Sequence, residues 1–144
     1  DMASKFDIDY LINSSEKDPV EEVLRLTNNI GANKVISANP STIAQQQAIL
    51  MTKKSGIVVF FGGVPKGALT EIDTNIIHYN GLWIYGHYGA NSIQVQKSFE
   101  LAISEKFPAK EIITHVLPLK DINEAIELTK RGEALKVVLL PDED

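Results

Sequence analysis

Five consecutive apolar residues, Ile57–Phe61, constrain the fold more than any other feature of this sequence. The run is β-branched and aromatic, carries no charge, and leads directly into the glycine-rich segment Gly62–Gly67. Because the run has no polar side, both of its faces need to be buried, which is typical of a central strand in a parallel sheet. The sequence therefore predicts an α/β fold built around this strand.

Strand-like and helix-like segments alternate along the rest of the chain. The sequence predicts strands at Tyr10–Ile12, Lys34–Ile36, Leu82–Tyr85, Ile112–Leu117 and Leu135–Leu140. It predicts helices from Asp18 to Gly31, from Thr42 to Lys54, from Ser92 to Lys106 and from Asp121 to Gly132. Strands that alternate with helices of this length favour a parallel sheet with right-handed crossovers.

Two of these helices begin with a recognisable capping sequence. Asp18 is followed by Pro19 and, three residues on, by a glutamate; Asp121 has a glutamate at the same spacing. This pattern predicts a capping box at both helix starts. In the helix that begins at Thr42, one side is predicted to carry Ile43, Ala44, Gln47, Ala48 and Met51.

Composition and charge restrict the partners. A chain of 144 residues with 44% hydrophobic residues suits one domain with a real core. Its formal net charge of -5 leaves no basic face for nucleic acid or an anionic membrane. No apolar run is long enough to span a bilayer and no signal peptide is expected, so a cytoplasmic location is predicted. The absence of cysteine excludes disulfides and thiolate metal ligands within these residues.

The loops that follow the predicted strands are the candidate binding site. In an open parallel sheet, ligands bind at the carboxyl ends of the strands. This rule singles out Ser37–Pro40, Gly62–Val64 and Gly86–Gly89. Gly62 and Gly63 lack a Cβ, so the backbone there can approach a flat ligand ring closely. The alternative is that any exit from a strand in an α/β protein favours glycine, and the sequence leaves both interpretations open.

Other familiar chemical motifs are excluded. The three histidines, His78 in a predicted loop, His87, and His115 in an extended stretch, are too scattered for metal-ligand spacing. Lys66 is followed by glycine rather than serine or threonine, so Gly62–Gly67 is not a phosphate-binding loop. No G-x-S-x-G sequence is present. No catalytic residue and no metal ligand is therefore predicted in this chain.

Several segments are similar to one known family. They are Lys5–Asn13, Val58–Gly67, Ile76–Tyr79, Ile84–Gly89, Ile113–Leu119, Ile122–Ala125 and Gly132–Val138. In this order and spacing, the chain resembles the C-terminal portion of the medium-chain, zinc-dependent alcohol and polyol dehydrogenases, in particular the sorbitol and threonine dehydrogenase branch. No single segment is diagnostic, but their order and spacing over nearly the full length of the chain are specific.

The resemblance implies a partial Rossmann-type parallel sheet with flanking helices, which lacks the first strands. Residues 1–88 would be part of a dinucleotide-binding domain, and residues 89–144 would return to a catalytic domain. NAD and zinc are implied as cofactors of the whole enzyme. The zinc ligands, the G-x-G-x-x-G turn and the ribose-binding acid would lie outside this chain, which is expected to be a fragment.

The resemblance also implies individual site residues and an activity. The implied cofactor-binding residues are Ala38, Asn39, Pro40, Gly62, Gly63, Val64, Tyr88 and Lys136. For Tyr88 the alternative is a cap on the core, and for Lys136 a solvated surface position. The implied activity is NAD-dependent oxidation of a small secondary alcohol or polyol. The fragment alone is expected to be inactive and to bind NAD weakly.

Some questions stay open at this stage. A non-catalytic α/β nucleotide-binding or regulatory module, or a docking piece, would share the same fold. The substrate and the choice between NAD and NADP are undetermined. The Tyr10–Ile12 strand could pair with another chain or with Lys34–Ile36. In similar enzymes this part of the chain packs on the catalytic domain. Without that domain, a homo-oligomer is predicted, because one group of apolar side chains needs a partner surface: Phe99, Ile103, Ile112, Ile113 and Leu117.

Overall fold

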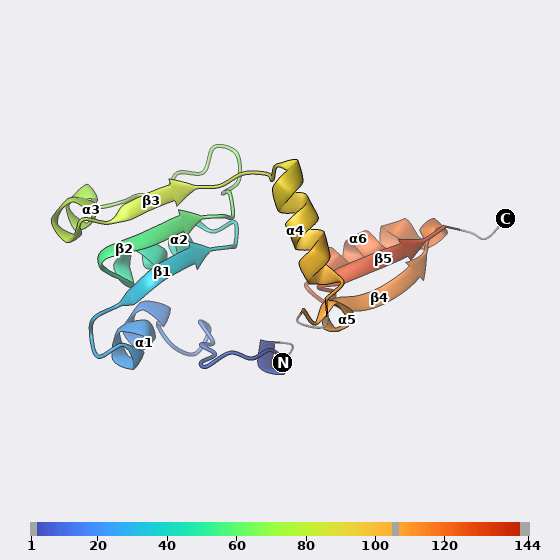
Figure 1. The fold of residues 1–144 in the computed structure, drawn as a ribbon, viewed down its shortest axis with the longest axis horizontal. Coiled ribbons are helices and arrows are strands. Elements are labelled where there is room, and N and C mark those ends of the chain that lie inside the picture. The colour runs from blue at the N-terminus through green and yellow to red at the C-terminus, as the bar shows by residue number, and fades with distance from the viewer. Residues whose placement is uncertain (1–2, 105–106, 142–144) are drawn as a thin grey trace. The chain divides into compact units, whose positions relative to one another are not determined.

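The computed structural model describes residues 3–104 and 107–141 (Figure 1). Contacts between residues divide the chain into two compact units. One unit is Tyr10–Gly89, and the other joins Asp1–Asp9 to Ala90–Asp144. The predicted division into residues 1–88 and 89–144 concerns their roles in an enzyme, and it stays a prediction.

The unit Tyr10–Gly89 is built on a three-stranded parallel sheet. Its strands are β1 (Ala32–Ser37), β2 (Thr52–Phe60) and β3 (Trp83–Gly86), in the order β1-β2-β3. Ser37 lies opposite Phe60, and Phe60 lies opposite Gly86. β2 is therefore central, as its apolar sequence predicted, and all three strands end at the same edge of the sheet (Figure 1).

Three α-helices of this unit accompany the sheet: α1 (Pro19–Leu26), α2 (Thr42–Leu50) and α3 (Thr74–Asn80). The buried core joins Ala48 and Ile49 of α2 to Val58 of β2 and to Leu82. Val58 is completely buried. The core thus lies between the central strand and α2, and it holds the carboxyl ends of the strands in fixed register.

The predicted strand at Tyr10–Ile12 is wrong. This segment has no regular secondary structure, and the side chains of Tyr10 and Leu11 are largely exposed. A strand is stabilised by hydrogen bonds to a neighbouring strand. Within the described part of the chain β1 pairs with β2 alone, so the proposed pairing of Tyr10–Ile12 with Lys34–Ile36 does not occur.

Both α1 and α2 are shorter than predicted. α1 ends at Leu26 rather than Gly31, because Asn28 and Asn29 take left-handed φ values of 53° and 62°. α2 ends at Leu50 rather than Lys54, because the chain enters β2 at Thr52. Four of the five residues predicted on one side of α2 line the same groove: Ala44, Gln47, Ala48 and Met51. The fifth, Ile43, is 62% exposed, and the helix also buries Gln45 and Ile49, which were not in the predicted set.

α3 was not predicted, and His78 lies within it rather than in a loop. The helix has clear end signals. The Asp73 side chain accepts a hydrogen bond from the Asn75 backbone N–H at 2.9 Å, and Gly81 closes the helix in the left-handed region. These two residues are the usual residue types at helix ends.

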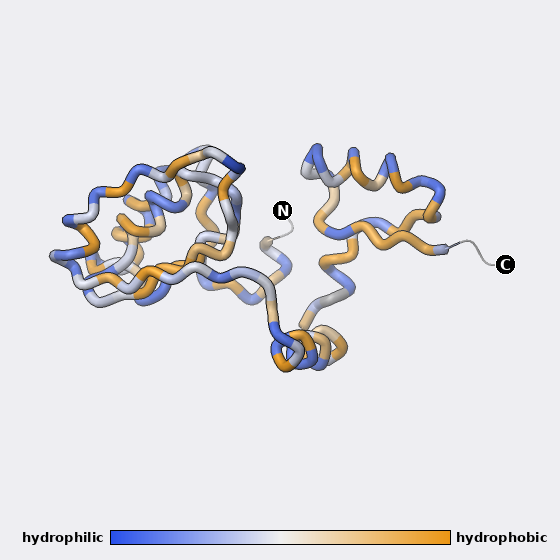
Figure 2. The backbone as a smooth tube through the Cα atoms, turned by 90° about the horizontal axis from the view of Figure 1, so that it is seen from above, coloured by the Kyte–Doolittle hydropathy of each residue, from blue (hydrophilic) through white to orange (hydrophobic). Residues whose placement is uncertain are grey.

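The second unit contains α4 (Ser92–Ala102), α5 (Ala109–Ile112), β4 (Ile113–Pro118), α6 (Ile122–Lys130) and β5 (Lys136–Leu140). Short 3-10 turns lie at Ala3–Lys5 and Leu119–Asp121. β4 and β5 pair in parallel. β5 is mostly hydrophobic, whereas α6 alternates hydrophobic and hydrophilic residues (Figure 2) and buries Ala125. The strands predicted at Ile112–Leu117 and Leu135–Leu140 are therefore present as β4 and β5.

Helix ends in the second unit differ from the predictions. Asp121 makes no side-chain capping bond, because the 3-10 turn leads straight into α6 and gives Asp121 a ψ of 23° instead of an extended value. A capping box is found instead at Asn91 and Gln94 of α4. α4 ends at Ala102, and the predicted end at Lys106 lies outside the described residues.

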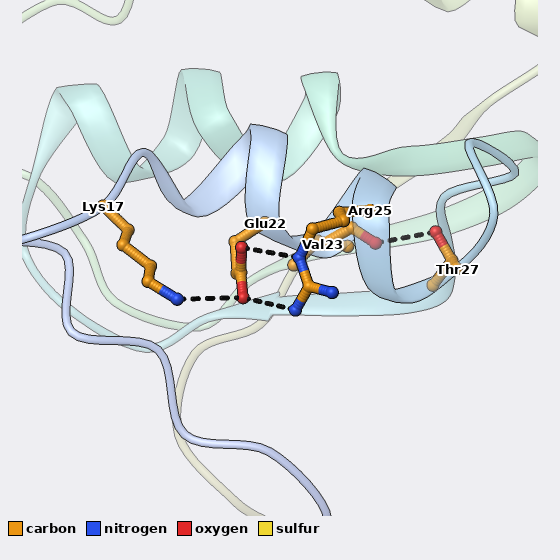
Figure 3. Close-up of polar contacts among 5 residues, drawn as sticks. All are labelled: Lys17, Glu22, Val23, Arg25 and Thr27. Carbon is orange, nitrogen blue, oxygen red and sulfur yellow. Dashed lines mark hydrogen bonds and ion pairs between the residues drawn. The ribbon is translucent and has the colours of Figure 1, made fainter.

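The predicted N-cap of α1 is confirmed, but within the described residues the Glu21 side chain accepts no bond from the Asp18 backbone N–H, so the predicted capping box is incomplete. The Asp18 side chain accepts hydrogen bonds from the backbone N–H groups of Val20 and Glu21, at 2.8 and 3.0 Å. One turn on, Glu22 accepts two bonds from Arg25, at 2.7 and 3.0 Å, and one from Lys17 at 3.3 Å (Figure 3). Chiefly through the Arg25 hydrogen bonds, this cluster lowers the pKa of Glu22 from 4.5 to about 2.

The lowered pKa of Glu22 predicts an acid-sensitive contribution to stability. A carboxyl group whose pKa falls on folding stabilises the folded state above its unfolded pKa, and this contribution is lost as the pH drops through the folded value. The loss should therefore occur between pH 4.5 and about 2. Urea unfolding across this range should show a shallower pH dependence for Glu22→Gln than for the wild type. Glu21→Gln, a change at an exposed neighbour, is the control, and equal slopes for both variants would contradict the assignment.

Candidate functional site

The chain leaves all three strands at the same edge of the sheet. We call the residues that directly follow each strand its exit. We call the segments 38–40, 62–64 and 87–89 the rim. The backbone N–H groups of Phe61 and Gly62 both donate to the Ser37 carbonyl, at 3.0 and 2.8 Å. The His87 N–H donates to the Phe60 carbonyl at 3.2 Å. Backbone hydrogen bonds therefore connect the exit of β2 to the exits of both neighbouring strands.

The two rim glycines have different surroundings. A Cβ added to Gly62 would lie 2.5 Å from the Asn39 carbonyl oxygen and 2.9 Å from the Ala38 carbonyl carbon. Glycine at this position is thus explained by backbone packing between two exits. Apart from the two neighbours in the chain, a Cβ added to Gly63 would meet no atom of the described residues within 4 Å. Of the two, only Gly63 presents its backbone to open space, where a ligand can reach it.

Aromatic rings lie beside these glycines. The rings of Phe61 and His87 are stacked, with centroids 5.9 Å apart and planes inclined by 11°. Phe61 is 58% exposed, so this pair lies at the surface. The Tyr88 side chain is fully exposed, and it therefore does not cap the core of this unit. The rim presents flat, accessible groups of the kind that contact planar ligands.

The exit of β1 borders a groove of about 360 Å³, between β1 and α2. Ala38 and Asn39 line it, together with Ser37 and residues of α2. The Ser37 hydroxyl is buried and has no hydrogen-bond partner among the described residues. Pro40 follows these residues and is exposed, and Val64 is half-buried in the exit of β2.

The sequence did not indicate Gln45, which the structure places beneath the rim. Its side chain is 7% exposed, and its Nε2 donates to the Gly62 carbonyl at 3.2 Å. The Thr70 hydroxyl donates to its Oε1 at 2.6 Å. Gln45 lies in the first turn of α2, shortly after the exit of β1. The one sequence signal for a role of Gln45 is that a polar residue occurs so soon after the exit of β1.

Lys136 belongs to the second unit, where it is the first residue of β5 and its side chain is exposed. The position of Lys136 near the pyrophosphate of a cofactor stays a prediction. The described residues contain no group of three or more His, Asp or Glu side chains that could hold a metal ion. They therefore do not fit a zinc site. No helix in the described ranges has the length and apolar character needed to cross a bilayer.

Known proteins match this chain over nearly its whole length. Residues 1–105 match the family model described as zinc-binding dehydrogenase. The chain is 32% identical over 148 aligned residues to L-threonine 3-dehydrogenase of Symbiobacterium thermophilum, covering 98% of this chain and 40% of that protein. It is 29% identical to sorbitol dehydrogenase of Halalkalibacterium halodurans, covering 96% of this chain and 40% of that one.

A solved structure has the same fold. Benzyl alcohol dehydrogenase of Acinetobacter calcoaceticus matches with a TM-score of 0.88 and 22% identity, over 98% of this chain and 39% of that one. At this identity the match concerns the fold alone. The chain spans about 40% of the length of the curated relatives described above.

Proposed function

The chain belongs to the zinc-binding dehydrogenase family, and on that premise we propose that the whole protein is an NAD-dependent dehydrogenase of a secondary alcohol. The observation that carries this proposal is the rim, where three parallel strands end together and the Gly63 backbone is open to a ligand. This is the edge at which open parallel sheets bind dinucleotides.

We assign the rim to the nicotinamide end of NAD. Ala38, Asn39 and Pro40 would line one side, and the backbone of Gly62, Gly63 and Val64 would line the floor. Tyr88 is fully exposed and free to pack on the ligand, and Lys136 would lie near the pyrophosphate. Residues 1–88 then serve as part of a dinucleotide-binding domain, and residues 89–144 pack on a catalytic domain.

NAD, when bound, supplies the hydride acceptor. The chain's own residues orient it and exclude water from one face. Zinc is proposed for the whole protein from family membership alone, because the described residues hold no ligand set for it. The substrate class that we propose is a small secondary alcohol or polyol, in a cytoplasmic enzyme.

We also propose that these 144 residues, when no catalytic domain covers them, form a homo-oligomer. Phe99, Ile103 and Ile113 of the second unit are 63%, 69% and 41% exposed, whereas Ile112 and Leu117 are half-buried. Exposed apolar side chains of this size favour a partner surface. Sedimentation velocity that shows a monomer over a wide concentration range would contradict this proposal.

A direct assay tests the activity. The whole protein, loaded with zinc, is mixed with NAD and with threonine or sorbitol, which the names of two relatives indicate. We expect NADH to form with a secondary alcohol and a metal chelator to stop the reaction. The isolated 144 residues should form no NADH and bind NAD weakly. Calorimetry that detects no NAD binding by the whole protein would favour a non-catalytic α/β module instead.

A further inference from the structure

We propose that Gln45 is a positioning residue for the cofactor rim, held in place by Thr70. This inference rests on the proposed function, since it concerns the same site. Gln45 does not face the open side of the rim. It acts through the backbone of Gly62, whose carbonyl accepts its Nε2–H at 3.2 Å.

The orientation of the Gln45 amide is set by its second contact. A glutamine amide has a carbonyl oxygen that accepts and an NH₂ group that donates. Because the Thr70 hydroxyl donates to Oε1 at 2.6 Å, the NH₂ group is left facing Gly62. Both ends of the amide are therefore used, and at 7% exposure water cannot readily replace either partner.

The Gly62 carbonyl and the Gly63 N–H belong to one planar peptide unit. In a trans peptide these two groups point in opposite directions, so a carbonyl held toward Gln45 turns the Gly63 N–H away from α2. That N–H makes no backbone hydrogen bond within the described ranges, and the space around Gly63 is open. Gln45 thus aims a free backbone donor at the position where a ligand acceptor can lie.

A purely structural role explains these contacts less well. The core partners of α2 are Ala48 and Ile49, one turn further along the helix. An apolar side chain at position 45 would fill the same space without the cost of burying an amide. The polar atoms of Gln45 instead form hydrogen bonds, one to the loop that follows β2 and one with Thr70.

The neighbouring Gln46 provides a matched control. Its Nε2 donates to the Glu71 carbonyl at 2.7 Å, so it makes the same kind of bond from the same helix. That bond does not involve the rim. Gln45→Leu and Gln46→Leu therefore each remove one amide–carbonyl bond, and only the Gln45 bond fixes the Gly62 peptide. Gln45→Leu also removes the bond from Thr70, which the Thr70 variants test separately.

The experiment measures NAD binding and steady-state kinetics of the whole protein. We expect Gln45→Leu to raise the Kd and the KM for NAD about tenfold, because the Gly62 carbonyl loses the partner that fixes its peptide. The KM for the alcohol should stay unchanged, and Gln46→Leu should bind NAD as the wild type does. Thr70→Val should weaken NAD binding in the same direction, and Thr70→Ser, which keeps the hydroxyl, should restore it.

Each outcome decides the inference. If wild type and Gln45→Leu bind NAD equally well, the inference is wrong and the proposed function stands. If the wild type binds no NAD, both fail. A parallel rise in the KM for NAD and for the alcohol would indicate a general structural role and overturn the inference. Should Gln45→Leu fail to fold, the pair Thr70→Val and Thr70→Ser gives the same test.

Discussion

Replacement of Gly63 by arginine is expected to weaken NAD binding by the whole protein by a factor of about 100 or more, which corresponds to about 2.7 kcal/mol. Apart from the two neighbours in the chain, no described atom lies within 4 Å of a Cβ at this position, so the new side chain starts in open space. It would instead occupy the space that we assign to the nicotinamide end of the cofactor. The melting temperature should therefore change little while the affinity for NAD is lost.

The matched control is Asn33→Arg. Asn33 is exposed and lies near the start of β1. This variant therefore adds the same arginine side chain at the edge where the strands begin, opposite the rim. Isothermal titration of NAD into both variants is the measurement. If Gly63→Arg is folded and binds NAD as tightly as the wild type, the ligand does not approach this glycine.

Val58→Asp is expected to abolish cooperative folding of the unit Tyr10–Gly89. Val58 is 0% exposed on the central strand, and it contacts the core residues of α2. A carboxylate there would lose its hydration without gaining a partner, at a cost of several kcal/mol. That cost is comparable to the whole stability of a domain, about 5–15 kcal/mol.

Ile43→Asp is the control for this substitution. Ile43 is also β-branched but is 62% exposed, and it lies in the first turn of α2, where a negative charge is favourable to the helix dipole. Thermal unfolding followed by circular dichroism should show a normal transition for Ile43→Asp and none for Val58→Asp. A normal transition for both variants would contradict the position assigned to the core.

The central strand and the exits could be predicted from the sequence because their signals are local. The run Ile57–Phe61 has no polar side, and Gly62 directly follows it. Burial on both faces then requires neighbouring strands, and short helical crossovers make those strands parallel. The common edge at which the three strands end follows from these facts alone.

Strand pairing itself is not local, which is why Tyr10–Ile12 was assigned wrongly. The segment is apolar enough for a strand, but a strand needs a partner, and the described chain supplies none at that place. The predicted side of α2 was incomplete for another reason. Apolar residues occur on several sides of this helix, and the run Gln45–Gln47 gives no contrast between faces. Two buried residues of this helix, Gln45 and Ile49, were therefore not predicted, although the buried Ala48 was.

The different roles of the two rim glycines could not be read from the chain either. Gly62 is explained by the Asn39 carbonyl, whose position depends on the packing of β1 against β2. Gly63 has the opposite surroundings, although it is the next residue. Capping signals such as Asp73 and Gly81 were present in the sequence and would have revealed α3.

Mapping of NAD onto the backbone by NMR tests the location of the site most directly. With the whole protein labelled with ¹⁵N and titrated with NAD, we predict that the amide signals of Gly62, Gly63 and Tyr88 shift, while those of Ala32 and Trp83, at the starts of their strands, do not. Shifts confined to the starts of the strands, or no shifts at saturating NAD, would contradict the coenzyme rim.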